Sequence, residues 1–476
     1  MSYGRAFAGM FALACAGCAP SAHVIQPQPL ESTRWSHAAD DLPDSEMAAP
    51  ANLAALLQSS DLAALTAAAL KNNPDIAIAS ARIERSSALL GEARLAALPS
   101  LSASAGASQK LGLGGGAIDF RSAFASLHIL IDIDPFGRIG GAKSAALARS
   151  RAADIQRELI QLAVETNVAR VWVTRAALAR RIQILDQAIG RAGELERVVH
   201  ARYDAGAATR VDVGQQSIRV NNMRRDRSQL LEALDKTRTA LATLCGAEAP
   251  KFEASPADIA SFALPRLIPP APGTLLAARP DVRASEALIA AANGDVRAAR
   301  AAFYPSLSFS SQGLLAGATG GLLTTSVTLG ASVLAPIFDR GRLNSNLRVA
   351  AADQVVAVEQ YRQTVLNALT EVEDITTTIG AARDRALLIH QIVKEARLTA
   401  RLARTQYIEG EEGLWTEIDA EQLLGDAESA EVLSLEERLL AQIALYQAMG
   451  GHREPLAARR LGIGRASVYR ALASGT

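Results

Sequence analysis

The sequence predicts an internally duplicated α+β membrane protein, and three observations lead to this prediction. Proline-bounded motifs recur more than 200 residues apart, four segments alternate apolar and small polar residues, and two stretches of more than 50 residues lack proline and read as helix. Such alternation suits strands that meet lipid on one face and water on the other. The 49 basic and 49 acidic side chains balance, which excludes a polybasic nucleic-acid binder.

The first twenty residues are typical of an export signal. Arg5 precedes the apolar run 6–14, which is too short to span a membrane. The run Cys15-Ala16-Gly17-Cys18 resembles a bacterial lipobox, in which the second cysteine becomes the acylated first residue of the mature chain. We therefore expect a signal peptide at residues 1–17, lipidation including palmitate at Cys18, and a lipid-anchored segment at residues 18–54. The alternative is an ordinary signal peptide in which Cys18 is incidental.

Two sets of matching motifs define an internal repeat. Asn73-Pro74-Asp75 and Pro99-Ser100-Leu101 recur 206 residues later as Arg279-Pro280-Asp281 and Pro305-Ser306-Leu307. The prolines bound two Ala-, Arg- and Leu-rich stretches, which predicts two helices of equal length. We expect a first repeat at residues 55–248, a connector at 249–279 and a second repeat at 280–451. The connector holds six prolines, which cannot occupy a helix interior or a central strand.

Each proline-bounded helix is followed by two segments with period-two alternation, so each repeat predicts two strands. The four expected strands are residues 101–108, 122–134, 307–312 and 326–333. Phe124 and Leu130 are exceptions on the polar face of the second strand. Four strands cannot close a transmembrane barrel, because an open edge in hydrocarbon leaves backbone groups unpaired. Closure needs strands from other chains, eight in a dimer or twelve in a trimer; the alternative is a soluble sheet with one face on a core.

Long helices follow each strand pair. Residues 143–200 and 343–408 read as uninterrupted helix, and residues 211–244 and 416–449 read as shorter return helices. Apolar residues at spacings of three and four, mixed with Arg and Gln, indicate coiled-coil packing with one wet face. A soluble periplasmic coiled coil would account for these helices, but it would leave the strands without a role.

In this order, the repeated elements resemble the TolC family of outer-membrane efflux channels, in particular its acylated OprM/NodT branch. The resemblance covers roughly residues 55–451. It is carried by the duplicated proline motifs, by the strand–helix junctions at residues 134–138 and 338–342, and by the turns Tyr203-x-x-Gly206 and Tyr407-x-x-Gly410. The family implies a homotrimer with a twelve-stranded β-barrel, four strands per chain, continuous with an α-helical coiled-coil tunnel. It also implies a passive exit duct that works with a periplasmic adaptor protein and an RND-type inner-membrane pump.

The resemblance places a gate at the two hairpin ends, residues 203–213 and 407–419. Asp419 falls at the family's acidic constriction, where three copies would form a carboxylate ring. The family's other constricting acid falls at Thr416, so a second ring is absent or supplied by Glu417. The positions of the family's interhelical lock hold Glu412 and Asp212, two acids that would repel each other.

We therefore expect a substitute lock between the hairpins. Arg210 lies two residues before Asp212 and is expected to pair with Glu412, with Tyr203 and Tyr407 hydrogen-bonding nearby. The alternative for Asp212 and Asp419 is that each merely caps or solvates the start of a helix.

Catalytic and metal-binding patterns are absent from the sequence. The six histidines are dispersed, and the sequence contains neither a P-loop nor a Gly-x-Ser-x-Gly elbow. We therefore expect no enzyme activity, no metal and no cofactor. A structural or adaptor-like periplasmic coiled-coil lipoprotein is the alternative function.

The last 25 residues, 452–476, do not fit the repeat. Residues 456–472 resemble the helix-turn-helix of resolvase-type recombinases. Because an exported chain does not meet DNA, we expect an acquired tail without a nucleic-acid partner. A cytoplasmic DNA-binding protein is the alternative that this tail suggests.

Overall fold

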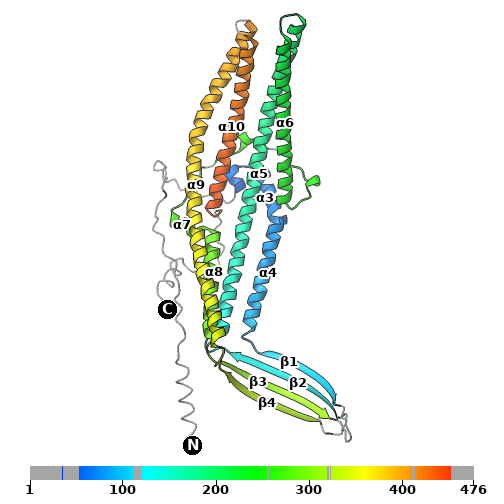
Figure 1. The fold of residues 1–476 in the computed structure, drawn as a ribbon, viewed down its shortest axis with the longest axis vertical. Helices are drawn as coiled ribbons and strands as arrows, with labels where there is room; N and C mark the ends of the chain where they lie inside the picture. Colours follow the sequence, from blue (N-terminus) through cyan, green and yellow to red (C-terminus); the bar gives the residue numbers. More distant parts are fainter. Residues whose placement is uncertain are drawn as a thin grey trace. The chain divides into compact units, whose positions relative to one another are not determined.

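The computed structural model describes residue 35 and residues 53–110, 120–254, 257–264, 266–318, 321, 323–409 and 413–451 (Figure 1). The expected signal peptide, Cys18 and the tail at 452–476 lie outside the described residues. The chain divides into two compact units. The sheet unit contains Ser80–Gln156 and Asp281–Thr364; the hairpin unit contains Arg157–Pro280 and the described parts of Leu30–Ala79 and Val365–Thr476. Each unit thus combines parts of both sequence repeats.

The helices occur in matched pairs, one member from each repeat. They are α4 (Pro74–Leu95) and α8 (Pro280–Ala301), α5 (Arg138–Asp204) and α9 (Arg340–Glu409), and α6 (Arg210–Leu244) and α10 (Leu414–Ala448). The proline-bounded helices have 22 residues each, which confirms the predicted equal length. Both start at proline, which fits the first turn because its N–H would have no intrahelical partner there. The long helices have 67 and 70 residues and the return helices 35 each.

The sheet unit holds four antiparallel strands in the order β1-β2-β3-β4 (Figure 1). They are β1 (Ser100–Lys110), β2 (Phe120–Ile133), β3 (Ser306–Ala318) and β4 (Thr324–Leu334). All three pairings join strands within the chain, so β1 and β4 each keep one edge without a strand partner among the described residues. Exposed edges of this kind are sites for pairing with another chain.

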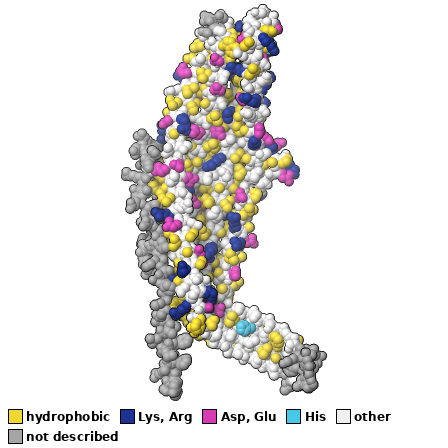
Figure 2. All heavy atoms as spheres, viewed as in Figure 1, with side chains coloured by type: hydrophobic (Ala, Val, Ile, Leu, Met, Phe, Trp, Pro, Cys, Tyr) yellow, Lys and Arg dark blue, Asp and Glu magenta, His cyan; other side chains and the backbone are white. Residues whose placement is uncertain are grey.

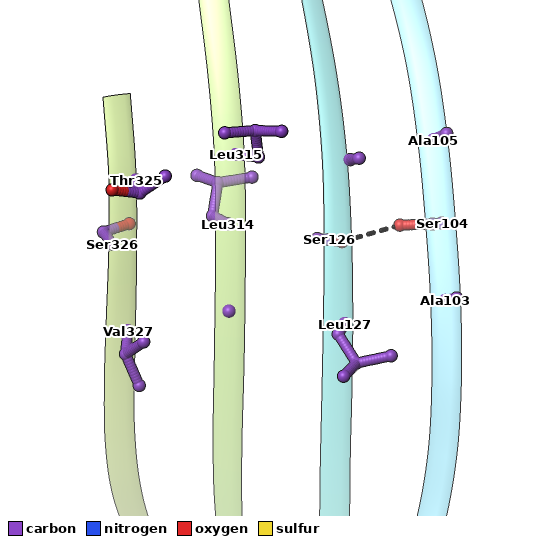
Figure 3. Close-up of a pocket in the computed structure, with 12 residues that line it drawn as sticks. Ala103, Ser104, Ala105, Ser126, Leu127, Leu314, Leu315, Thr325, Ser326 and Val327 are labelled. Carbon is purple, nitrogen blue, oxygen red and sulfur yellow. Dashed lines mark hydrogen bonds between the residues drawn. The ribbon is translucent and has the colours of Figure 1, made fainter. Parts of the chain in front are cut away.

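The pairing register keeps most apolar and polar residues on separate faces, with Leu314 in the row of Ser126 and Ser311 in the row of Ile129 among the exceptions. Leu127 lies opposite Ala103 on one side and Gly313 on the other, whereas the neighbouring row contains His128 and Gln312. Hydrogen bonds link Ser104 to Ser126, Ser108 to Ser122 and Ser308 to Ser332 across the strands, at 2.8, 2.8 and 2.7 Å. Figure 3 shows the first of these bonds in a shallow hollow lined by all four strands. The predicted alternation is therefore confirmed in space.

Charged side chains are distributed unevenly between the two kinds of element. Figure 2 shows Lys, Arg, Asp and Glu spread over the helices and almost none on the visible face of the sheet. Among the described residues, no helix combines the length and the apolar character needed to cross a membrane.

The duplication extends to the way in which each return helix is capped. The Asn73 side chain donates from Nδ2 to the Leu244 carbonyl at 2.9 Å, and Arg279 donates from Nη1 to the Ala448 carbonyl at 2.8 Å. Asn73 and Arg279 are 206 residues apart, and each precedes the proline that begins α4 or α8. Each repeat thus ties the end of its return helix to the start of its proline-bounded helix, which satisfies a carbonyl that the helix leaves unpaired.

The hairpin unit has the main hydrophobic core. The middle of α5 packs there against α2 (Leu53–Leu57), α3 (Ser60–Asn72), the end of α10 and the connector. Arg175, on α5, is buried and donates to the Leu234 carbonyl at 2.9 Å and to the Ala254 carbonyl of the connector. The connector also forms a short helix, α7 (Pro272–Ala278), which the count of prolines did not predict; Pro272 is tolerated because it occupies the first turn.

Candidate functional site

The candidate site comprises the two hairpin ends, both in the hairpin unit. The first end joins α5 to α6 across residues 205–209, and the second joins α9 to α10 across residues 410–413. Gly206 has a φ of +73° and lets the chain leave α5, with the Ala207 amide returning to the Arg202 carbonyl at 2.7 Å. Residues 410–412 lie outside the described residues, so the predicted pair between Arg210 and Glu412 stays a prediction.

Asp212 forms hydrogen bonds with Thr209 at the start of α6. Its carboxylate accepts the Thr209 amide at 2.8 Å, and the Thr209 hydroxyl accepts the Asp212 amide at 3.2 Å, which together form a capping box. The Thr209 hydroxyl also donates to the Asp212 carboxylate at 2.8 Å. The hydrogen bonds from the Thr209 amide and then from its hydroxyl hold the pKa of Asp212 below its ordinary value. The geometry of Asp212 is that of the capping alternative.

Tyr407 connects the two hairpin ends through its ring. The Arg202 guanidinium carbon lies 5.1 Å from the centre of the Tyr407 ring, within range for a cation–π contact. The Tyr407 hydroxyl is buried and has no hydrogen-bond partner in the described part of the chain. Tyr203 is exposed. Because Glu412 lies outside the described residues, the expected tyrosine hydrogen bonds near it stay a prediction, and the contact that the structure describes at Tyr407 is the one with Arg202.

Arg219, on α6, reaches the N-terminal part of α10, beyond its first turn. It donates from Nη2 to the Ile418 carbonyl at 3.0 Å and to the Gln422 side chain at 2.9 Å. Burial lowers the pKa of Arg219, while the charges of Asp419 and Asp426 raise it. The exposed Asp419 carboxylate therefore has a cation from the other hairpin nearby.

A second arginine of the first hairpin also contacts α10. Arg191, on α5, forms an ion pair with Glu421 at 2.7 Å. In each of these contacts of the described residues, by Arg191, Arg202 and Arg219, the cation thus lies on the first hairpin and its partner on the second.

The other predicted constriction residues differ in exposure. Thr416 is exposed, whereas Glu417 is half-buried and its Oε2 atom has no hydrogen-bond partner among the described residues. Burial raises the pKa of Glu417; the Arg404 charge opposes this shift and the Glu421 charge adds to it. Of the acids at the second hairpin end, Glu417 is thus partly withdrawn from solvent and Asp419 is open to it.

The two hairpin ends were predictable from the sequence, whereas the roles of Arg191, Arg202 and Arg219 were not predicted. One pattern could have found Arg219. Val213, Gln216 and Val220 are buried at helical spacing on α6, and Gln216 donates to the Ala192 carbonyl of α5 at 2.9 Å. Arg219 follows Gln216 by three residues and therefore lies beside this seam.

Comparison with known proteins identifies the family. The family model described as "Outer membrane efflux protein" matches residues 65–247 and 271–451. Pyoverdine export outer membrane protein OpmQ of Pseudomonas putida is 31% identical over 406 residues, covering 83% of this chain and 86% of that protein. Toluene efflux pump outer membrane protein TtgI, also of P. putida, is 27% identical over 403 residues and covers 82% and 85%.

Solved structures share the fold. The outer-membrane channel OprN superposes with a TM-score of 0.81 at 24% identity, over 90% of this chain and 99% of that one. The Campylobacter jejuni CmeC outer membrane channel superposes with a TM-score of 0.83 at 20% identity, over 95% and 98%. The family model matches the chain in two segments, and each segment contains one helical hairpin and two of the four strands. This chain belongs to the outer membrane efflux protein family and is an outer-membrane efflux component with the TolC-like fold.

Proposed function

We propose that three copies of this chain form an exit channel in the outer membrane, with a β-barrel that is closed by strands from all three copies. The observation that supports this proposal is the four-stranded sheet, which separates its apolar and polar residues by face and leaves an edge open on β1 and on β4. Three such sheets make a twelve-stranded barrel, which removes the open edges that hydrocarbon does not tolerate. A periplasmic coiled-coil lipoprotein, the alternative, has no use for such a sheet.

The mature chain begins at Cys18 and is held in the outer membrane by lipid on that residue as well as by the barrel. Residues 18–54 form the anchored segment, and repeats 55–248 and 280–451 supply strands and hairpins. The tail at 452–476 binds no nucleic acid in this account.

The channel works as a passive duct in a tripartite system. Its helical hairpins dock on a periplasmic adaptor protein, and an RND-type inner-membrane pump supplies energy and selects cargo. The names of the relatives include both pyoverdine export and toluene efflux. This range fits a duct whose cargo is set by the pump, and the channel itself performs no catalysis.

The gate is at the hairpin ends. Three copies of Asp419 form a carboxylate ring that holds cations, and Thr416 and Glu417 border it. Arg202, Arg219 and Arg191 keep the second hairpin against the first, with acceptors on the second hairpin. A pair between Arg210 and Glu412 adds to this restraint.

The test is native mass spectrometry of membrane-extracted protein, with conductance of the same sample in planar bilayers. We expect a trimer with three acylated Cys18 residues that conducts ions, and a changed conductance in the Asp419→Ala variant. A soluble, non-conducting species would overturn the channel and favour the coiled-coil lipoprotein. For the predicted Arg210 pair, unchanged conductance and drug leakiness in Arg210→Ala would remove it from the gate.

A further inference from the structure

Phe124 is an apolar residue on the polar face of the sheet. The alternation of β2 places it in line with Ser122 and Ser126, on the face that meets water in the proposed channel. Its side chain is 45% exposed. We infer that Phe124 forms an apolar contact site in the lumen wall, which binds the aromatic group of a solute in transit. This inference rests on the proposed trimer, in which the site occurs once in each copy.

Gly106 of β1 gives the Phe124 ring a fixed seat. The two residues lie opposite each other in the pairing of β1 with β2. A Cβ atom added to Gly106 would lie 2.7 Å from Cε1 and 2.9 Å from Cζ of the ring, so the ring covers the glycine and any side chain there would displace it. Aromatic rings that cover a glycine of a neighbouring strand are a recurring feature of sheets. The ring therefore has a defined position on the lumen wall.

Two further apolar residues extend this surface onto β3. Ala316 lies directly opposite Phe124, and Leu314 lies one row away on the same face, diagonal to the ring. Diagonal neighbours on one face of a sheet are within reach of an aromatic side chain. Both Ala316 and Leu314 are half-buried. The apolar surface thus runs across three strands, from Gly106 to these two residues.

Hydrogen-bonded serines border the apolar surface. Ser104 with Ser126 and Ser108 with Ser122 occupy the rows on either side of Phe124, and in each pair the two hydroxyls are 2.8 Å apart. An apolar surface surrounded by hydroxyls suits an amphipathic solute, whose aromatic part contacts the ring while its polar groups meet the serines and water.

The second repeat shows that the strand pairing does not require an aromatic residue at this position. Gly106 corresponds to Gln312 at the offset of 206 residues that relates the proline motifs, and Phe124 corresponds to Thr328 at the offset of 204 that relates residues 134–138 to 338–342. Gln312 and Thr328 also lie opposite each other, in the pairing of β3 with β4. The same place in the duplicated sheet is thus filled by two polar residues, which indicates that the Phe124 ring has a role besides joining its strands.

The ligand class follows from what the lumen face can meet. In a channel, this face contacts water, ions and the solutes that pass through. Contact with an aromatic group removes exposed ring area from water and adds stacked or edge-to-face attraction between the rings. A positive charge on the same solute is attracted to the face of the ring. We therefore expect aromatic cations to be bound more strongly than cations of the same charge without a ring.

Block of the K⁺ current by an aromatic cation tests the site in the trimeric lipoprotein in planar bilayers. Benzyltrimethylammonium and tetramethylammonium carry the same charge and differ by one phenyl ring. Both are added on the extracellular side, so that the proposed periplasmic gate is not on their path. In the wild type we expect benzyltrimethylammonium to reach half-block at a concentration about threefold or more below that of tetramethylammonium. Phe124→Ala should remove this difference without changing the block by tetramethylammonium.

Three further variants separate the ring from its packing. Phe124→Leu keeps an apolar group over Gly106 but removes the ring, and should raise the half-blocking concentration of benzyltrimethylammonium about twofold or more. Gly106→Ala displaces the ring and should change it in the same direction. Phe309→Ala is the matched control, because Phe309 is 43% exposed but lies in the apolar row of β3, on the opposite face. It should leave the block by both cations unchanged.

Transplanting the pair into the second repeat provides a gain of function. Gln312→Gly with Thr328→Phe rebuilds the glycine and the ring between β3 and β4, which doubles the number of sites per trimer. The half-blocking concentration of benzyltrimethylammonium should fall about twofold, because each added site binds independently of the first.

The outcomes distinguish the site from the channel. If the wild type conducts but both cations block it equally, or if Phe124→Ala and Phe124→Leu block like the wild type, the site is wrong while the channel stands, and Phe124 only packs on Gly106. If Phe124→Ala does not assemble, Phe124→Leu and the transplanted pair decide the question in the same way. A wild type that forms no conducting trimer would overturn the proposed channel first.

Discussion

The two hairpin ends have the same architecture, but they are stabilised differently. The first return helix, α6, starts with the Thr209–Asp212 capping box, so its first turn is satisfied locally. The second, α10, starts at Gly413, which provides no side-chain cap. Arg219 of the first hairpin donates to the Ile418 carbonyl and the Gln422 side chain farther along α10, which holds this helix against the first hairpin without capping the N–H groups of its first turn.

This difference assigns separate roles to the two ends. An element capped by its own residues stays formed when its neighbours move, whereas an element held by distant side chains is released when those contacts break. The packing of α10 against α9 is also modest here, since its buried contacts near the end involve Ala400, Ala403 and Ala420. We therefore expect the first end to be the fixed part of the gate and the second end to be the moving part.

The largest effect is expected from removing the arginine that holds the moving end. Arg219→Ala deletes two hydrogen bonds from a charged donor, worth about 1–2 kcal/mol at a half-exposed site. The open-to-closed ratio in planar bilayers should rise about 5–30-fold. Arg225→Ala is the matched control, because in the part of the chain that the structure describes Arg225 pairs only with its neighbour Asp226 on the same helix. Equal behaviour of the two variants would contradict the proposed restraint.

Removing the cap tests the fixed end. Thr209→Ala should destabilise the first turn of α6 by about 1 kcal/mol and speed hydrogen exchange of the Val213 amide about fivefold. Thr239→Ala, in the same helix, removes a hydroxyl that only returns to the Lys236 carbonyl and should leave exchange at Val213 unchanged. The account fails on this point if both variants exchange like the wild type.

The Glu417 carboxyl makes the packing of the second hairpin end depend on pH. Burial raises its pKa above the ordinary value of 4.5, so the packed state binds more protons than the released state between 4.5 and the raised value. Packing is therefore strongest below 4.5 and weakens as the pH rises through that window. Open probability should rise modestly, less than tenfold, over the same window, and Glu417→Gln should flatten that component. A rise in open probability on acidification would contradict this prediction.

The smallest effect is expected from giving the moving end a cap of its own. Gly413→Ser places a hydroxyl at the N-cap of α10, where the gain over glycine is a few tenths of a kcal/mol. Open probability should fall slightly, by less than twofold. Gly425→Ser, inside α10 at a position where an added Cβ would have nothing within 4 Å, is the control; a fall of the same size there would show that the cap is not responsible.

The helices and strands of the fold were predictable from the sequence, whereas the contacts between the two hairpin ends were not. Proline spacing predicted α4 and α8 with equal lengths, and alternation predicted all four strands, because both signals are local. The contacts of Arg202 and Arg219 depend on which faces of long, alanine-rich helices meet. That rotation is weakly encoded, since apolar and polar residues are mixed around α5 and α9. For Asp212 the sequence allows both a gate residue and a helix cap, and the structure shows it in a capping box with Thr209, a residue at capping-box spacing in the sequence.

Hydrogen exchange of the wild-type trimer in lipid, followed at both hairpin ends in the same sample, tests the central claim most directly. We predict that the amides at residues 416–418, near the start of α10, exchange faster than those at residues 212–213 of α6. We also predict that Arg219→Ala widens the difference by accelerating only the second end. Equal protection at both ends, or faster exchange at the first end, would contradict the assignment of a fixed and a moving end.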